Sequence, residues 1–436
     1  MKIIKAICLT QILCFFLSPA MHAQFNVDGQ IVQRAEYRHG YGKLIGEQEE
    51  AAAFISQRAR INVQYELESF RFYVSVQDVR NWGNTSQVKL TDPYFSLHEA
   101  WAETFLSKNF SIKLGRQELN YDNFRFLGNL DWALQARAHD FALLKYEKGT
   151  AKLHLGGGYN QDAERLSGNF FSTPNQYKVA HFLRYENTLG KLNFSALFWN
   201  NGLQYSKAND VGEITDTGIH YRQTLGIPTL RYQFGNTGLS GFYYHQLGKD
   251  AQGRKVNAFD ASAQISHLFA IDTARGSNFR VTLGIELISG TDPVDISAEN
   301  NSYSPLYGTN HAHNGYMDMF YVGARHENSV GLRDIFLRLR YDMNPKLFMS
   351  LNTHSFNSFT PYSEYEDEHL GFEADLAVGY ILNRAVSLQA GYSQFFQSNT
   401  LENLHNVQNP AGVQNWGYLM MIYRPTMKNR FIGLLF

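Results

Sequence analysis

The residues of this 436-residue sequence with the clearest chemical potential are arginines that alternate with apolar residues along short segments. A guanidinium group can bind a carboxylate through two parallel hydrogen bonds and release it stepwise in water. Arg58 and Arg60 lie in one such segment, and Arg338 and Arg340 lie in another. If both segments are strands of one wall, these charges face the same side and attract anionic solutes.

Other charged residues fall on the same side of the alternating segments or in the connections between them. We expect the whole set to line the path of a solute through a hydrated pore. Arg116 shares the parity of the apolar Leu114, so we expect it at the external rim or after a bulge, and Arg80 needs a bulge to face inward. The predicted pore-lining residues are Arg34, Arg58, Arg60, Arg71, Arg80, Lys113, Arg116, Arg125, Arg137, Arg338, Arg340, Glu99, Glu373 and Asp375.

Two structural explanations compete with this interpretation. Acids on the same walls can pair with the arginines and leave a nearly neutral pore. Alternatively, charged residues between positions 114 and 140 pin an inward-folded loop by ion pairs and never touch a solute. The residues open to this second explanation are Arg116, Arg125, Arg137, Asp122, Asp131 and Asp140.

Other arrangements that carry chemistry are weak. His311 and His313 lack a supporting carboxylate pattern for a metal site, and serine, histidine and aspartate are scattered without a nucleophile arrangement. We therefore expect no catalytic residue, no metal and no cofactor. The 39 Lys and Arg residues against 40 Asp and Glu give a net charge of −1, which excludes the basic surface typical of nucleic-acid binding.

The elements that must position these charges are β-strands. Apolar and polar residues alternate in segments of about ten residues, for example over 55–67, 279–287 and 370–380, as in transmembrane strands. We count eighteen segments from 25–38 to 415–424, with sixteen as the neighbouring answer because 203–228 and 291–330 are difficult to assign. The sequence thus predicts an all-β protein, a single transmembrane antiparallel β-barrel.

The connections between the segments alternate in length. Short turns such as Lys148-Gly149 and Leu189-Gly190 are expected on the periplasmic side, and long polar loops on the outside. The loops 119–136 and 291–330 contain many aromatic residues, so we expect at least one of them to fold over or into the lumen rather than expose an apolar patch.

The N-terminus predicts export. Lys2 and Lys5 precede an apolar stretch, and small residues surround Ala20 and Ala23, so residues 1–23 are a predicted signal peptide and 24–436 the barrel. The only two cysteines, Cys8 and Cys14, lie within that peptide. The mature chain would therefore contain no thiol, which suits the oxidising periplasm.

The segment 114–140 contains Gly115-Arg116-Gln117, followed by Arg125, Gly128, Trp132, Arg137 and Asp140. This pattern resembles the characteristic segment of the alginate export porin family, outer-membrane barrels that pass an anionic polysaccharide. Leu306-Tyr307-Gly308-Thr309-Asn310-His311 and Gly315-Tyr316-Met317-Asp318 resemble the long loop of its Bacteroidetes-type members. The resemblance implies a location in the outer membrane, contact with its lipid, and periplasmic export components as partners.

The sequence therefore predicts an outer-membrane channel that passively conducts anionic solutes, with export of a uronate-rich polysaccharide as its specific form. The alternative in the same class is a general or sugar-uptake porin. An outer-membrane barrel enzyme or an adhesin is the alternative of another class. A channel needs a hydrated, charged wall, whereas an enzyme needs one compact catalytic cluster.

Overall fold

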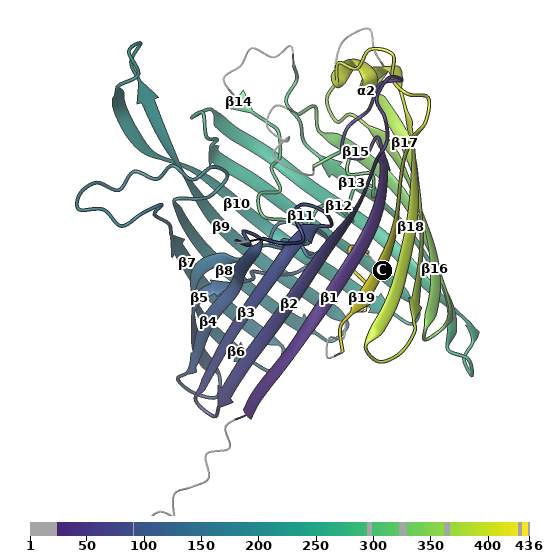
Figure 1. Ribbon diagram of the computed structural model, residues 1–436, viewed down its shortest axis with the longest axis horizontal. Helices are drawn as coiled ribbons and strands as arrows, with labels where there is room; N and C mark the ends of the chain where they lie inside the picture. The colour runs from purple at the N-terminus through teal and green to yellow at the C-terminus, as the bar shows by residue number, and fades with distance from the viewer. Residues whose placement is uncertain are drawn as a thin grey trace, which may run out of the picture.

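The computed structural model describes residues 24–89, 91–293, 299–321, 329–361, 367–425 and 430–434. The predicted signal peptide, residues 1–23, lies outside the described residues. Across the described part of the chain, eighteen long strands form one closed antiparallel sheet, which confirms the predicted barrel (Figure 1). The barrel closes where β1 pairs with β19, from Ile31 opposite Tyr423 to His39 opposite Asn415.

The strands follow one another around the wall in chain order, apart from the short β14, which pairs parallel to β12 above the wall. The elements are β1 (Gln24–His39), β2 (Ala52–Leu67), β3 (Phe70–Asn81), β4 (Phe95–Phe105), β5 (Phe110–Gln117), β6 (His139–Lys148), β7 (Ala151–Tyr159), β8 (Val179–Leu189), β9 (Leu192–Ala208), β10 (Ile214–Phe234), β11 (Thr237–Lys249), β12 (Lys255–Asp272), β13 (Ser277–Ile288), β14 (Glu299–Asn300), β15 (Leu332–Asn344), β16 (Leu347–Asn357), β17 (His369–Ile381), β18 (Val386–Gln397), α2 (Asn399–Leu404) and β19 (Gln414–Tyr423).

Alternation along each strand separates a lipid-facing side from a lumen-facing side. In β2, Arg58 is fully buried and Arg60 is 7% exposed, whereas Ile61, the next residue, is 56% exposed on the outer surface. Leu114, Leu283 and Leu419 are likewise exposed on other strands. This outer band of apolar side chains is the surface expected to meet lipid. Among the described residues no helix is long and apolar enough to cross a membrane.

The two ends of the barrel differ as predicted. Tight turns join the strands at the end where the described chain begins, and Gly149 and Gly190 adopt a positive φ of 61° in two of them. Long connections join the strands at the other end, where α2 lies (Figure 1). We assign the short-turn end to the periplasm, following the usual arrangement of outer-membrane barrels.

One strand is much longer than predicted. We expected a short strand over 229–235, but β10 has 21 residues and pairs with β9 up to Ala208. The two form a hairpin that rises beyond the rim at the upper left of Figure 1. The alternation is interrupted where the register shifts between Ile227 and Leu230, around Pro228, and this interruption concealed the first part of the strand.

Candidate functional site

Two loops fold into the lumen and contact each other there. The first comprises residues 118–138, between β5 and β6, and the second comprises 299–321, between β13 and β15; we call the pair the septum. Leu127 forms a parallel bridge with Tyr307, and Gly128 N donates to Tyr307 O at 3.0 Å. Thr309 N donates to Phe124 O at 2.7 Å. The expectation that at least one aromatic-rich loop folds inward is therefore confirmed, and both do.

The close approach of the two loops depends on a glycine. A Cβ atom added to Gly308 would lie 2.1 Å from Arg125 O and 2.7 Å from Arg125 C, both backbone atoms. Seven of the ten non-glycine residues with positive φ in the described chain lie in the septum: Asp122, Phe124, Leu130, Ala136, Leu306, Asp318 and Tyr321. Such conformations persist only where surrounding contacts hold them, so the septum has a defined structure.

Arg125 anchors the first loop to a distant part of the wall. Its Nε lies 2.9 Å from Asp260 Oδ2 in β12 and 3.1 Å from Glu286 Oε1 in β13. It also donates to Asn310 Oδ1 of the second loop at 3.2 Å. Arg125 and Asp260 are both fully buried, so this guanidinium does not contact a solute in either half of the lumen.

Asp131 anchors the same loop to the side of the wall where the barrel closes. Arg58 lies 2.7 Å from Asp131 Oδ1, and Arg424, just after β19, lies 2.7 Å from Asp131 Oδ2. Burial alone would raise the pKa of Asp131, but the charges of Arg58 and Arg424 outweigh it and lower the pKa well below its usual range. Asp131 is therefore ionised throughout the physiological range.

Aromatic side chains complete the contact between the septum and the wall. Trp132 stacks on His311 with ring centroids 4.0 Å apart, and its ring edge meets Trp416 and Tyr418 of β19. The Arg34 guanidinium lies 4.2 Å from the centroid of the Trp132 ring. Trp132 is only 4% exposed, so the septum buries the aromatic residues that the sequence placed in these loops.

The septum divides the lumen into two vestibules. The external vestibule has a volume of about 1580 Å³ and is lined by Trp132–His139 and Tyr307 of the septum region. The periplasmic vestibule has a volume of about 500 Å³ and is lined by Asp122–Phe124 and His313. A solute crossing the barrel would therefore pass from one vestibule to the other through or around the septum.

Charges in the external vestibule are mostly paired. Its lining contains Arg34, Arg38, Arg80, Arg116 and Arg137 against Glu36 and Asp318. Glu36 lies 2.7 Å from Arg34 and 2.8 Å from Arg38. Arg137 differs, because in the described chain its guanidinium has no carboxylate partner and donates only to Gly308 O, at 2.9 Å. Pairing therefore neutralises much of this half of the pore.

The periplasmic vestibule contains arginines without carboxylate partners. Its lining contains Arg231, Arg280, Arg338 and Arg340 against Asp122 and Glu286. Arg280 stands directly opposite Arg340 in the β13–β15 register, next to the pair of Thr282 and Arg338. Arg340 pairs with Asp342 at 2.7 Å, but Arg231, Arg280 and Arg338 form no ion pair among the described residues. Like charges across a strand pair destabilise a sheet, so this cluster has a cost.

Two predicted pore residues lie at the external rim. Arg116 keeps the parity of Leu114 with no bulge in the β5–β6 register, and it pairs with Asp140 at 3.1 Å. Arg80 pairs with Asp78 and, at 2.6 Å, with Asp92. The bulge that we expected to turn Arg80 inward is absent, because the β2–β3 register is unbroken. Both side chains border the external vestibule from its rim.

The other predicted residues face the lumen but are covered or paired. Arg60 donates to Gln77, Arg71 lies 2.5 Å from Glu66, and Lys113 Nζ lies 3.8 Å from the Trp101 ring centroid. Glu373 and Asp375 are fully buried beneath the second loop, where they accept from Met317 N at 2.8 Å and Tyr316 N at 3.4 Å. These two acids hold the septum rather than line a vestibule.

The two histidines of the second loop have structural roles. His311 Nδ1 lies 2.8 Å from Asp318 Oδ1, and its ring stacks between Trp132 and Tyr316. Burial, with the charges of Arg125 and Arg338, lowers the pKa of His313 well below its usual range. Neither histidine belongs to the one group in the described chain that offers a metal three ligand atoms within 4.8 Å of one another, which is His98, Glu99 and Glu118.

The segment 430–434 also occupies the lumen, and sequence reasoning missed it. Its contacts with β18 and with the septum place these five residues inside the barrel. Gln389 of β18 donates to Ile432 O at 2.9 Å and accepts from Ile432 N at 3.0 Å. A Cβ atom on Gly433 would lie 2.2 Å from Trp132 Cε3, so this segment packs against the septum. Its sequence, Arg430 followed by Phe-Ile-Gly-Leu, is too short to show alternation and gave no sign of this position.

The closed eighteen-stranded wall, its outer apolar band and its inward loops define the class of an outer-membrane β-barrel porin. Residues 24–168 match the model of the alginate export family, which confirms the resemblance over this region. The match ends before residues 306–318, so the resemblance of the second loop to Bacteroidetes-type members stays a prediction. This partial family match and the barrel fold together indicate a channel in the outer membrane rather than an enzyme.

Solved structures share the fold at low sequence identity. A BenF-like porin from Pseudomonas fluorescens Pf-5 is 12% identical with a TM-score of 0.57, covering 92% of this chain and 98% of that chain. OccK11 of Pseudomonas aeruginosa is 13% identical with a TM-score of 0.55, covering 92% and 95%. OpdK of Pseudomonas aeruginosa, solved with vanillate, is 11% identical with a TM-score of 0.56, covering 91% and 98%. A comparison with curated proteins found no match.

Proposed function

We propose that this porin passively conducts anionic solutes whose charge is carried by carboxylate groups. The cluster of Arg280, Arg338 and Arg340 in the periplasmic vestibule carries the proposal. Arg280 and Arg338 form no ion pair among the described residues, whereas Arg340 beside them pairs with Asp342, and an anion or its hydration water close to Arg280 and Arg338 would stabilise them. Their field acts on every ion that passes the 500 Å³ vestibule.

Arg137 supports the same proposal from the external side. Its guanidinium borders the external vestibule beside the septum, with a single hydrogen bond to the backbone. An anion that has entered the external vestibule would meet Arg137 before the septum and the arginine cluster after it. Positive charge on both sides of the septum favours anions over cations along the whole path.

Export of a uronate-rich polysaccharide is the specific form of this proposal, supported by the match of residues 24–168 to the alginate export family. A polymer needs a continuous path, so the septum would have to move, and periplasmic export components would deliver the chain. The uptake of small carboxylates is the alternative. The bound vanillate in the structure of OpdK, which shares this fold, is itself a carboxylate.

Reversal potentials in planar bilayers test the proposal. Wild-type channels in a salt gradient should select anions, and added oligouronates should block the current. Block by monouronates and vanillate without block by oligouronates would favour small-solute uptake over polymer export. Cation selectivity of the wild-type channel would contradict the proposal in both forms.

A further inference from the structure

A β-bulge in β4 places two consecutive side chains on the lumen side of the wall. Ser75 of β3 pairs with Glu99, but the next residue, Val76, pairs with Leu97, so His98 is the additional residue in β4. Leu97 is 48% exposed on the outer surface, whereas His98 is only 4% exposed. Without the bulge, His98 and Glu99 would lie on opposite faces of the sheet.

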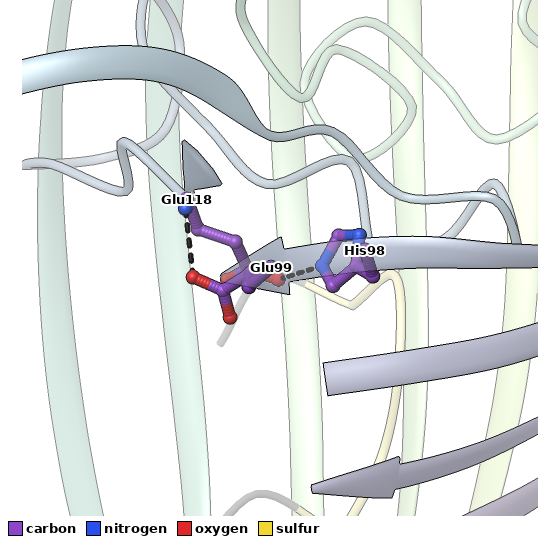
Figure 2. Close-up of side chains that lie close together, drawn as sticks. All are labelled: His98, Glu99 and Glu118. Atoms are coloured by element: carbon purple, nitrogen blue, oxygen red, sulfur yellow. Dashed lines mark hydrogen bonds and ion pairs between the residues drawn. The ribbon is translucent and has the colours of Figure 1, made fainter. Parts of the chain in front are cut away.

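Glu118, the first residue of the septum, meets this pair. Figure 2 shows the three side chains converging from the strand and from the start of the loop. His98 Nε2 lies 2.8 Å from Glu118 Oε1, and Glu118 N donates to Glu99 Oε2 at 2.9 Å. One ligand atom from each residue lies within 4.8 Å of the other two.

Neutral donors hold both carboxylates in place. Trp101 Nε1 donates to Glu99 Oε2 at 3.2 Å, and Asn129 Nδ2 donates to Glu118 Oε2 at 3.0 Å. Outer partners of this kind orient the ligands of metal centres. These two donors leave Glu99 Oε1 and Glu118 Oε1, the oxygen that faces His98, available to a cation.

The negative charge of this group is poorly compensated. Glu99 forms no ion pair among the described residues, Lys113 acts on it only at longer range, and the guanidinium group nearest Glu118 is that of Arg60, at 3.9 Å. Arg60 meanwhile donates to Gln77 Oε1 at 2.6 Å. Other inward carboxylates of this wall have close cations, such as Glu103 with Lys145 at 2.9 Å. An added divalent cation would supply the missing charge.

We propose that His98, Glu99 and Glu118 bind a divalent transition metal, with Zn²⁺ the best match. An imidazole nitrogen with two carboxylate oxygens suits Zn²⁺, whereas Ca²⁺ takes oxygen ligands only. The metal would join β4 to the first residue of the septum and strengthen the attachment of the loop to the wall. The site lies beside the external vestibule, which His98 borders, so metal can reach it from the outside.

Calorimetric titration of the full-length protein in detergent tests the site after treatment with EDTA and dialysis. We expect saturable binding of one Zn²⁺ per chain, no comparable binding of Ca²⁺, and loss of the Zn²⁺ site in the double variant Glu99→Gln/Glu118→Gln. Co²⁺ in place of Zn²⁺ should give visible absorption bands that disappear in His98→Ala. Glu66→Gln removes a lumen carboxylate that already pairs with Arg71, so it should bind Zn²⁺ like wild type.

Heat-modifiable migration shows that each variant is a folded barrel before it is titrated. Saturable Zn²⁺ binding that survives in the double variant would place the ion elsewhere and overturn the proposal. Absence of saturable Zn²⁺ binding by the wild-type protein would overturn it too. Neither result bears on anion selectivity, which is measured independently.

Discussion

Arg125 of the first septum loop forms a buried ion pair with Asp260 of β12, 135 residues away in the sequence, with Nε and Oδ2 2.9 Å apart. The pair joins the loop to the wall, and Glu286 Oε1 of β13 lies 3.1 Å from the same Nε. One cation therefore compensates two buried carboxylates. The position of the loop between the vestibules depends on this arrangement.

Arg125→Gln should release the first loop from the wall. Removing one partner of a buried ion pair costs about 3–5 kcal/mol, because the remaining charges stay buried without compensation. We expect higher single-channel conductance with a barrel that still shows heat-modifiable migration. Arg116→Gln is the matched control, since the exposed pair with Asp140 contributes about 0–1 kcal/mol. Equal conductance of Arg125→Gln and wild type would show that this contact does not hold the septum.

Arg280→Gln/Arg338→Gln should shift the reversal potential toward that of a cation-selective channel. Both side chains border the periplasmic vestibule and have no carboxylate partner in the described chain. The shift should be largest at 0.1 M salt or below and small at 1 M, where the Debye length falls from about 10 Å to about 3 Å. Arg275→Gln removes the same charge from an exposed turn, with 82% of the side chain accessible, and should leave selectivity unchanged.

The lowered pKa of Asp131 predicts how the septum responds to acid. Its pKa is lowered in the folded protein, so its contribution to stability is complete above its unfolded pKa of about 4 and is lost as the pH falls below that value. Asp131 should therefore hold the septum equally well from pH 7 to pH 5, so that the wild-type conductance does not change over this range. Asp131→Asn should have a higher conductance already at pH 7, and its difference from wild type should shrink below about pH 4. A difference that grows on acidification would contradict the assigned role.

The side of the wall that each charge faces could be predicted from the sequence, because alternation in a strand is a local property. Arg58, Arg60, Arg338 and Arg340 all face the lumen as expected. Their accessibility could not be predicted, since it depends on where the septum lies. Arg58 is covered by the first loop at Asp131, whereas Arg338 borders an open vestibule. The sequence treated these arginines alike, and the structure assigns them different roles.

Irregularities within strands could not be predicted from the sequence either. His98 and Glu99 are neighbours in the sequence, so parity places them on opposite faces, and the pairing with β3 reveals the bulge. The two explanations that the sequence left open each hold in part. Ion pairs pin the first loop through Arg125 and Asp131, and pairing neutralises much of the external vestibule. Arg280 and Arg338 in the periplasmic vestibule fit neither explanation, because they form no ion pair among the described residues.

Gln389→Ala should free the segment 430–434 from the wall and widen the periplasmic half of the lumen. The amide of Gln389 both donates to and accepts from the backbone of Ile432, and no hydrophobic side chain can replace that pair of hydrogen bonds. We expect higher conductance and faster proteolysis after Arg430, with barrel migration unchanged. Gln394→Ala is the control, because the Gln394 side chain, also in β18, bonds to backbone carbonyls and to Tyr392 and not to the segment 430–434. Wild-type conductance in Gln389→Ala would mean that this segment does not restrict the pore.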